Sequence, residues 1–253
     1  MNLILLDEHD LIDASRVTLT DTRAAHLLDV LRVTPGQAVR VGLLDGPSGT
    51  GTIETANTGS VTMRCEFETV TPARPPVDVL LALPRPKVMR RLWAQLAALG
   101  VGRIILTNAS RVERDYFDTH VLTEASYRPW LIEGLQQARD TRLPQVSIHR
   151  QFKILVEDHL DTLFASGVRL VADPSGTQSM MDALASCDER VLIAIGPEGG
   201  WNEFELSLLG AHGFSRVGLG PRTLRVDTAC VALLSLAHAA HASARVAVPN
   251  RDV

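Results

Sequence analysis

Two glycine-rich stretches near the C-terminus carry charged residues whose types suit acid–base chemistry. Glu198 lies inside the turn 196–200, and Arg225 and Asp227 follow Gly220. A carboxylate can accept a proton from a reacting group, and a guanidinium can stabilise negative charge that develops on an oxygen. The alternative role is structural, because Arg225 could pair with either acid and brace the loops. The sequence leaves both roles open.

Each glycine-rich turn follows an apolar run and precedes a helical pattern. Residues 191–195 are all apolar, which is typical of a strand covered on both faces of a parallel sheet. Asn202 is expected to cap the helix after the first turn, and a second helix is expected from about Val226. Loops that follow parallel strands meet at one edge of the sheet, where open α/β folds bind ligands.

The chain before these stretches alternates strands with helices, which predicts a mostly parallel α/β domain. The loop 173–176 follows an expected strand at 169–172 and is therefore a third loop at the same edge. A phosphate-binding loop is disfavoured, because no Lys-Ser/Thr pair follows the glycines and the GxGxxG spacing is missing. Pro129 lies within a long helical region, where a kink or a restart is expected.

The first 70 residues predict a small β-rich domain. Short strands separated by glycine-containing turns are typical of a barrel, and Thr20 is the expected cap of its helix. The segment 71–76 contains three prolines and reads as an extended linker. We therefore expect one domain at 1–72 and a second at 73–253.

Charge and cysteine content limit the classes of protein to which this chain can belong. The formal net charge is −4, but residues 74–153 carry thirteen basic against seven acidic residues, as a surface that contacts phosphates would require. Solvent-exposed helix faces that bind no phosphate could have the same excess of basic residues. No apolar run is long enough to span a bilayer, and the N-terminus does not resemble a signal peptide. Three scattered cysteines suggest reduced, buried thiols in a cytoplasmic protein without a metal site.

The two stretches read GPEGGWNEFE and LGPRTLRVDTA, and together they resemble the SPOUT class of S-adenosylmethionine-dependent RNA methyltransferases. The most similar family methylates N3 of a uridine in 16S ribosomal RNA (ribosomal RNA small subunit methyltransferase E). The resemblance implies a C-terminal α/β domain with a trefoil knot, a PUA-like RNA-binding β-barrel before it, and a homodimer that acts on the small ribosomal subunit. Where the family usually has LRTETA, this chain has LRVDTA at 224–229, so Asp227 reaches less far than the usual Glu.

The resemblance also implies roles for individual residues, with S-adenosylmethionine as the cofactor and no metal. Expected catalytic residues are Arg225, Glu198 and Asp227. Expected cofactor-binding residues are Ala172, Ile195, Gly196, Glu198, Gly199, Gly200, Leu219, Gly220, Leu224 and Arg225. Expected RNA-binding residues are His26, Arg32, Arg85, Lys87, Arg90, Gln137 and Arg142.

Two other functions remain open, a catalytically silent RNA-binding or ribosome-assembly protein and a SPOUT enzyme that acts on another RNA. The segment 226–240 is apolar nearly all round a helix, so most of its sides must be covered. We expect a second copy of the chain to cover part of it, with Leu234 in the interface.

Overall fold

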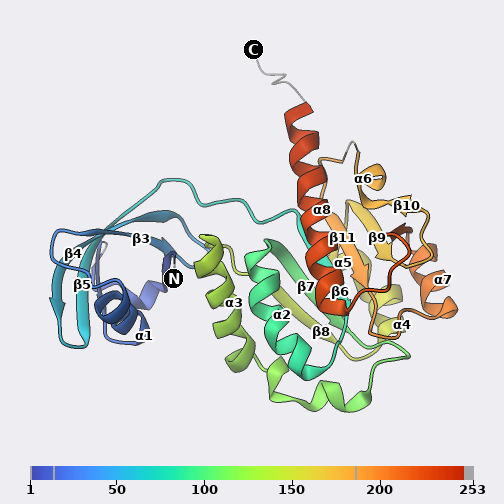
Figure 1. Cartoon of the computed structure of the whole chain (residues 1–253), viewed down its shortest axis with the longest axis horizontal. Helices are drawn as coiled ribbons and strands as arrows, with labels where there is room; N and C mark the ends of the chain where they lie inside the picture. The colour runs from blue at the N-terminus through green and yellow to red at the C-terminus, as the bar shows by residue number, and fades with distance from the viewer. Residues whose placement is uncertain (1, 14, 186, 248–253) are drawn as a thin grey trace. The chain divides into compact units, whose positions relative to one another are not determined.

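The computed structural model describes residues 2–13, 15–185 and 187–247, and its contacts divide the chain into two compact units (Figure 1). One unit combines Met1–Arg74 with Pro129–Leu143. The other combines Pro75–Arg128 with Pro144–Val253. The sequence predicts a domain boundary between residues 72 and 73, and this boundary stays a prediction.

The second unit is built on a seven-stranded sheet in which every pair is parallel. The strands, in their order across the sheet, are β10 (Gln178–Ser179), β12 (Phe214–Gly218), β9 (Val168–Ala172), β11 (Val191–Ile195), β6 (Val77–Ala82), β7 (Val101–Thr107) and β8 (Gln145–His149). All side chains of β6 and β11 are buried, as expected for central strands with helices on both faces. The predicted strand at 191–195 is confirmed.

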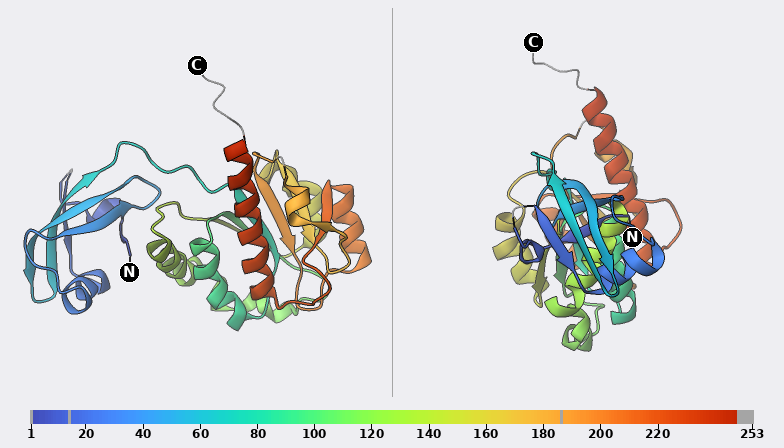
Figure 2. Two further views of the ribbon diagram at one scale, coloured as in Figure 1. Left: turned by 45° about the horizontal axis from the view of Figure 1, so that its top comes forward. Right: turned by 90° about the vertical axis from the view of Figure 1, so that its left-hand side faces the viewer.

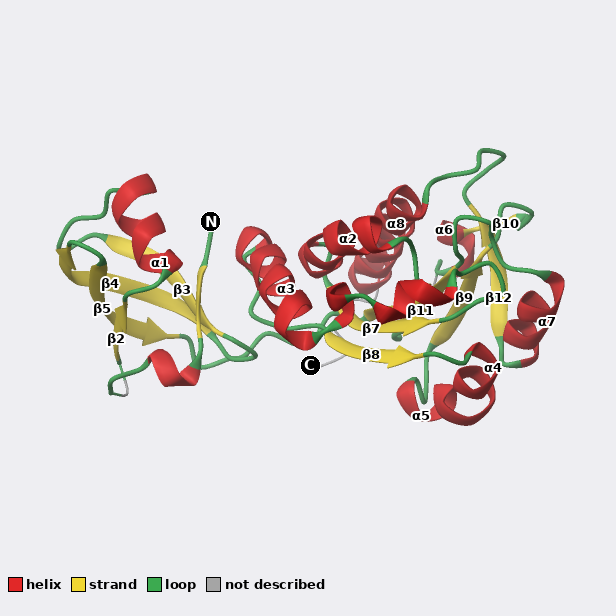
Figure 3. Ribbon diagram, turned by 90° about the horizontal axis from the view of Figure 1, so that it is seen from below, coloured by secondary structure: helices red, strands yellow, loops and turns green. Residues whose placement is uncertain are grey.

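Helices cover both faces of this sheet (Figure 3). α2 (Pro86–Ala98), α6 (Met180–Ala183) and α8 (Val226–Ala247) lie on one face, where α8 contacts both other helices as well as β6 and β11. α4 (Phe152–Ile154), the π-helical turn η5 (Leu155–His159) and α5 (Leu160–Leu163) lie on the other, and α7 (Glu203–Ala211) packs beside β12. Short 3₁₀ turns, η3 (Arg114–Asp118) and η4 (His120–Leu122), lead into α3 (Glu124–Ala138), which continues through Pro129 without a restart.

The long helix α8 is better covered inside one chain than its sequence suggests. Its apolar residues Val226, Cys230, Leu233, Leu234 and Ala237 are all buried within the chain. The expectation that Leu234 faces a second copy is therefore wrong, since its side chain is fully buried against its own subunit. Val231 does remain exposed, at 40% of its surface.

The first unit contains a five-stranded sheet that curls into an open half-barrel (Figure 2). Its strands, in order across the sheet, are β1 (Ile4–Leu6), β3 (Ala38–Leu43), β4 (Ser48–Asn57), β5 (Ser60–Phe67) and β2 (Arg16–Leu19). Among the described residues of this sheet, β1 and β3 pair in parallel and the other neighbouring strands pair antiparallel. Apolar side chains such as Val17, Leu27, Val41 and Met63 form the hydrophobic core of this unit, so the predicted β-rich domain is confirmed.

The helix of this unit is capped one residue later than predicted. α1 (Thr22–Ala25) runs directly into the π-helical turn η2 (His26–Val30), and a 3₁₀ turn, η1 (Glu8–Asp10), follows β1. Asp21, not Thr20, is the N-cap, because its carboxylate accepts a hydrogen bond from the Arg23 N–H.

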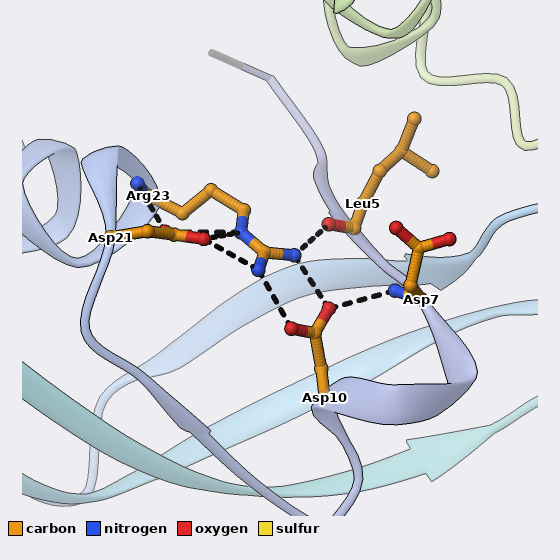
Figure 4. Close-up of polar contacts among 5 residues, drawn as sticks. All are labelled: Leu5, Asp7, Asp10, Asp21 and Arg23. Carbon is orange, nitrogen blue, oxygen red and sulfur yellow. Dashed lines mark hydrogen bonds and ion pairs between the residues drawn. The ribbon is translucent and has the colours of Figure 1, made fainter. Parts of the chain in front are cut away.

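Arg23 ties this helix to the first strand of the sheet (Figure 4). Its guanidinium pairs with Asp10 and Asp21, each at 2.7 Å, and donates to the Leu5 carbonyl at 2.8 Å. Burial alone would raise the pKa of Asp10, but hydrogen bonds from Arg23 and from the Asp7 N–H outweigh it and lower that pKa. Arg23 is therefore a structural residue of the half-barrel.

The segment 129–143 belongs to the first unit through contacts near its C-terminal end. The buried Thr141 hydroxyl donates to the Gly46 carbonyl at 2.6 Å, and Arg142 donates to the Asp45 carbonyl at 2.7 Å.

Cys65, Cys187 and Cys230 are buried free thiols, as expected, and burial raises the pKa of Cys65 to about 11. No helix among the described residues is long and apolar enough to cross a membrane.

Candidate functional site

A cavity of about 400 Å³ opens at the carboxyl edge of the parallel sheet, and we call it the loop cavity. Three loops surround it, those that follow β9, β11 and β12, as the sequence predicts. Its lining residues are Arg111, Ala172, Asp173, Pro174, Ser175, Ile195, Gly196, Pro197, Glu198, Gly199, Gly200, Trp201, Leu206, Val217, Leu219, Gly220, Arg222, Thr223, Leu224, Val226, Ala229 and Leu233. Its volume and largely apolar lining are typical of sites that bind a small molecule or cofactor.

Glycines shape the loops around this cavity in different ways. Gly200 and Gly220 have φ angles of 74° and 90°, a left-handed conformation that residues with a Cβ rarely adopt. A Cβ on Gly196 would lie 3.2 Å from the Trp201 ring, so this glycine allows the indole to pack over the turn. A Cβ on Gly199 would instead lie 2.8 Å from Cδ of Arg111 and would displace that side chain.

The loop after β9 meets the end of β12 through a close approach of two backbones. A Cβ on Gly218 would overlap the Gly176 carbonyl oxygen, and one on Gly176 would lie 2.7 Å from the Val217 carbonyl carbon. Only glycine permits this contact. The loop after β9 and the end of β12 therefore pack backbone against backbone at this side of the cavity.

A buried carboxylate joins the loop after β7 to the start of α7. Glu205, only 3% exposed, accepts hydrogen bonds from the Ser110 N–H at 2.6 Å and from the Asn202 N–H at 2.8 Å. Asn202 caps α7 in return, by accepting from the Glu205 N–H at 2.8 Å, which confirms the predicted cap. This link carries Arg111 to the cavity, where its guanidinium donates to the Gly199 carbonyl.

Arg111 and Trp201 are cavity residues that the sequence reasoning missed. Arg111 follows β7, so its position after a parallel strand was the available signal. Trp201 follows the second of two glycines and packs against Phe152 with ring centroids 5.4 Å apart. Its buried Nε1 has no hydrogen-bond partner among the described residues, so the cavity wall holds an unused donor.

A second, smaller opening of about 360 Å³ lies beside the loop cavity, and we call it the arginine cleft. Its lining residues are Arg85, Val88, Arg91, Glu198, Arg225, Val226 and Asp227. Glu198 and Val226 line both openings, so the two sites adjoin. The helices α2 and α8 both begin here, and their N-terminal ends carry partial positive charge.

The three expected catalytic residues come together in this cleft, but they do not pair with one another. Asp227 pairs with Arg91 at 3.1 Å, and Glu198 accepts a hydrogen bond from the Arg85 backbone N–H at 3.3 Å. The Arg225 guanidinium is exposed and pairs with neither acid nor with any other described residue. The structural role considered for Arg225, an ion pair with one of these acids, therefore finds no support, because Arg91 makes the ion pair with Asp227.

The expected cofactor residues lie in the loop cavity with one exception. All of them except Arg225 line it, and Arg225 lines the arginine cleft instead. Of the expected RNA-binding residues on α2 and its cap, Arg85 lines the cleft, while Lys87 and Arg90 are exposed beside it. The residue at the cleft is Arg91, the neighbour of the predicted Arg90.

The other expected RNA-binding residues belong to the first unit. Arg32 and Gln137 are exposed, and the Gln137 carbonyl accepts from the Asn2 side chain at 3.0 Å. His26 is half-buried, and burial lowers its pKa. Arg142 is largely engaged within the unit, since it bonds to the Asp45 carbonyl and lies 3.6 Å from the Asp45 carboxylate. An RNA contact is thus a better prediction for Arg32 than for Arg142.

Comparisons with known proteins agree with this architecture. The family described as "RNA methyltransferase domain" matches residues 71–238. The chain is 30% identical to ribosomal RNA small subunit methyltransferase E of Treponema pallidum over 94% of this chain and 92% of the relative. It is 25% identical to ribosomal RNA small subunit methyltransferase E 1 of Borreliella burgdorferi over 92% of this chain and 95% of that one.

Among solved structures, the fold is similar to that of ribosomal RNA small subunit methyltransferase E from Neisseria gonorrhoeae bound to S-adenosyl methionine. The TM-score is 0.74 at 20% identity, with 93% of this chain and 95% of that chain covered. The likeness extends over the β half-barrel and the parallel sheet, so the SPOUT-like fold that the two glycine-rich stretches suggested is confirmed. The chain belongs to the RNA methyltransferase family represented by ribosomal RNA small subunit methyltransferase E.

Proposed function

We propose that this protein transfers a methyl group from S-adenosylmethionine to N3 of a uridine in 16S ribosomal RNA. The observation that carries the proposal is the adjacency of two unlike openings, a loop cavity of cofactor size and an arginine cleft, with Glu198 in the wall of both. Family membership supports the class of reaction, and the names of the relatives support ribosomal RNA as the substrate.

The residues of the loop cavity fit S-adenosylmethionine. Glycine loops expose backbone N–H and carbonyl groups to polar atoms of the cofactor. Leu206, Val217 and Leu233 provide apolar surface for a ring system. When bound, the cofactor would supply an electrophilic methyl group.

The chain's own residues supply the rest of the reaction. N3 of uracil carries a proton that must leave for the methyl group to be added, and negative charge develops on the ring oxygens as that proton leaves and is neutralised by the methyl transfer. Glu198 is our proposed base, because it lies where the two openings meet. Arg225, whose guanidinium has no protein partner among the described residues, is positioned to stabilise the oxygen charge. Asp227 is held by Arg91 and acts in positioning.

RNA binding would involve both units. We propose residues 1–72 as an RNA-binding domain that contacts RNA through His26 and Arg32, and 73–253 as the methyltransferase domain. Gln137 and Arg142 would contribute from the segment that packs with the first unit. Arg85, Lys87 and Arg90 would contact phosphates beside the cleft. We propose that the enzyme acts in the cytoplasm, where its proposed substrate, ribosomal RNA, is assembled into subunits.

We also propose that the protein acts as a homodimer. Val231 on α8 is exposed and Leu236 is only half-buried, so apolar side chains of this helix remain uncovered within one chain. Val231→Glu should yield folded monomers, whereas Leu234→Glu should unfold the chain because Leu234 is buried within it. Light scattering and circular dichroism measure both outcomes, and a wild-type chain that is monomeric and active would contradict the dimer.

The competing function is a catalytically silent RNA-binding or assembly protein with the same fold. Calorimetric titration with S-adenosylmethionine separates the two, since only the enzyme needs the cofactor. We expect saturable binding of one cofactor per chain. Absence of binding at millimolar cofactor, with RNA binding retained, would favour the silent protein.

A further inference from the structure

The arginine cleft contains more positive charge than its two acids compensate. Asp227 is neutralised by Arg91, and its other oxygen accepts from the Thr228 N–H at 3.0 Å. Glu198 accepts from the Arg85 backbone, which leaves the Arg85 guanidinium to the cleft and to its contact with Tyr116. Arg225 adds a third guanidinium that has no partner in the described chain.

The position of the cleft limits what anion it can bind. It adjoins the loop cavity at Glu198 and Val226, so a group in the cleft lies next to the place where the methyl group would be transferred. The loop cavity has its own cations, Arg111 and Arg222, of which Arg222 makes no ion pair with a described residue. The carboxylate of a bound cofactor can therefore be compensated without the cleft.

We propose that the arginine cleft binds one backbone phosphate of the RNA strand, adjacent to the nucleotide that is methylated. Arg85 and Arg91 contact this phosphate, Arg91 from the side on which it holds Asp227, and the Arg225 guanidinium remains for the uracil oxygens. Guanidinium groups suit this role because their forked donors match the oxygens of a phosphodiester. The inference rests on the proposed function, from which it takes RNA as the substrate.

Arg91 is the residue that tests this site, because removing it has two separable consequences. Arg91→Gln removes a phosphate ligand and also leaves the Asp227 carboxylate without its partner. The double variant Arg91→Gln/Asp227→Asn removes the ligand without creating an unpaired acid. Lys153→Gln is the matched control, since Lys153 is an exposed residue on α4 that lines neither opening and, among the described residues, pairs only with Glu157, at 3.8 Å.

The measurement is the affinity for deproteinised small-subunit ribosomal RNA, without cofactor, as a function of salt concentration. Each phosphate contact contributes about 0.7 to 0.9 to the slope of log affinity against log salt. We expect the slope to decrease by about this amount in both Arg91 variants and to stay at the wild-type value in Lys153→Gln. Cofactor affinity, measured by calorimetry, should be unchanged in all three.

Two results would overturn the proposal. If the double variant regains the wild-type slope, Arg91 only braces Asp227 and contacts no phosphate. If the Arg91 variants lose cofactor affinity while the slope stays constant, the cleft binds the cofactor's carboxylate instead. Failure of the proposed function would give a different result. A wild-type chain that binds no cofactor, with Arg91 variants that still show the smaller salt slope, would have the phosphate site but no methyltransferase activity.

Discussion

The loop cavity and the arginine cleft adjoin each other, yet they are built from different parts of the chain. The cavity is shaped by backbone, with left-handed Gly200 and Gly220 and the tight contact between Gly176 and Gly218. The cleft is shaped by long charged side chains at the N-terminal ends of α2 and α8 and in the loop after β11. The difference indicates that shape selects the ligand in one region and charge selects it in the other. Substitutions that change volume should therefore harm the cavity, and those that change charge should harm the cleft.

The largest expected effect comes from Glu198, which belongs to both regions. Glu198→Gln keeps the size of the side chain but removes the proposed base, so kcat should fall by about 10²- to 10⁴-fold. Cofactor affinity should change little. Single-turnover methyl transfer measures the rate, with Asp227→Asn as the comparison. A greater loss in Asp227→Asn would show that the acids have been assigned the wrong way round.

Arg225 tests whether the cleft acts on the reaction itself. Arg225→Gln removes a charge that has no protein partner among the described residues, so folding should be unaffected. We expect kcat to fall by about 10²- to 10³-fold, the usual size of a lost oxyanion contact, while cofactor affinity is retained. Equal losses in turnover and in cofactor affinity would assign Arg225 to the loop cavity after all.

A larger side chain in the loop cavity should weaken cofactor binding and leave RNA binding unchanged. Ala229 lines the cavity from α8, and Ala229→Leu introduces a larger side chain without disturbing the helix. Overpacking costs about 1–3 kcal/mol, so cofactor affinity should fall roughly tenfold or more. RNA affinity at fixed salt should remain that of the wild type. A parallel loss of both affinities in a folded variant would mean that the two regions are one site.

The smallest expected effect is on the stability of the unit that carries both openings. Burial lowers the pKa of His149, at the end of β8, and of His238, on α8. The unfolded chain then binds protons more readily, so the free energy of unfolding is highest above pH about 6.5 and falls as pH decreases through that value. Thermal unfolding between pH about 8 and about 5.5 should show this decrease. A double His149→Gln/His238→Gln variant should show a flatter profile, and an unchanged profile would exclude these histidines as the cause.

Local patterns were enough to predict the frame of the site. The apolar run 191–195, the cap at Asn202 and the turns that follow β11 and β12 depend on neighbours in sequence, and each lies where expected. The two motifs also identified the family, because their order and spacing are specific. Residue types at the ends of parallel strands then indicated most of the cavity.

The remaining features depend on contacts between residues far apart in the chain. No local pattern indicates that Asp227 pairs with Arg91 rather than Arg225, because this ion pair follows from the packing of α2 against α8. The full burial of Leu234 and the packing of segment 129–143 with the half-barrel have the same origin. Arg111 reaches the cavity only because the buried Glu205 holds its loop.

The central claim, methylation of N3 of a uridine, is tested most directly on ribosomal RNA. Small-subunit RNA from a strain that lacks this gene should be analysed by mass spectrometry before and after incubation with the purified protein and S-adenosylmethionine. The account predicts one uridine that gains a methyl group on N3 after incubation, and none with the Glu198→Gln variant. A methyl group at another atom or in another RNA, or no methylation by a protein that binds the cofactor, would contradict it.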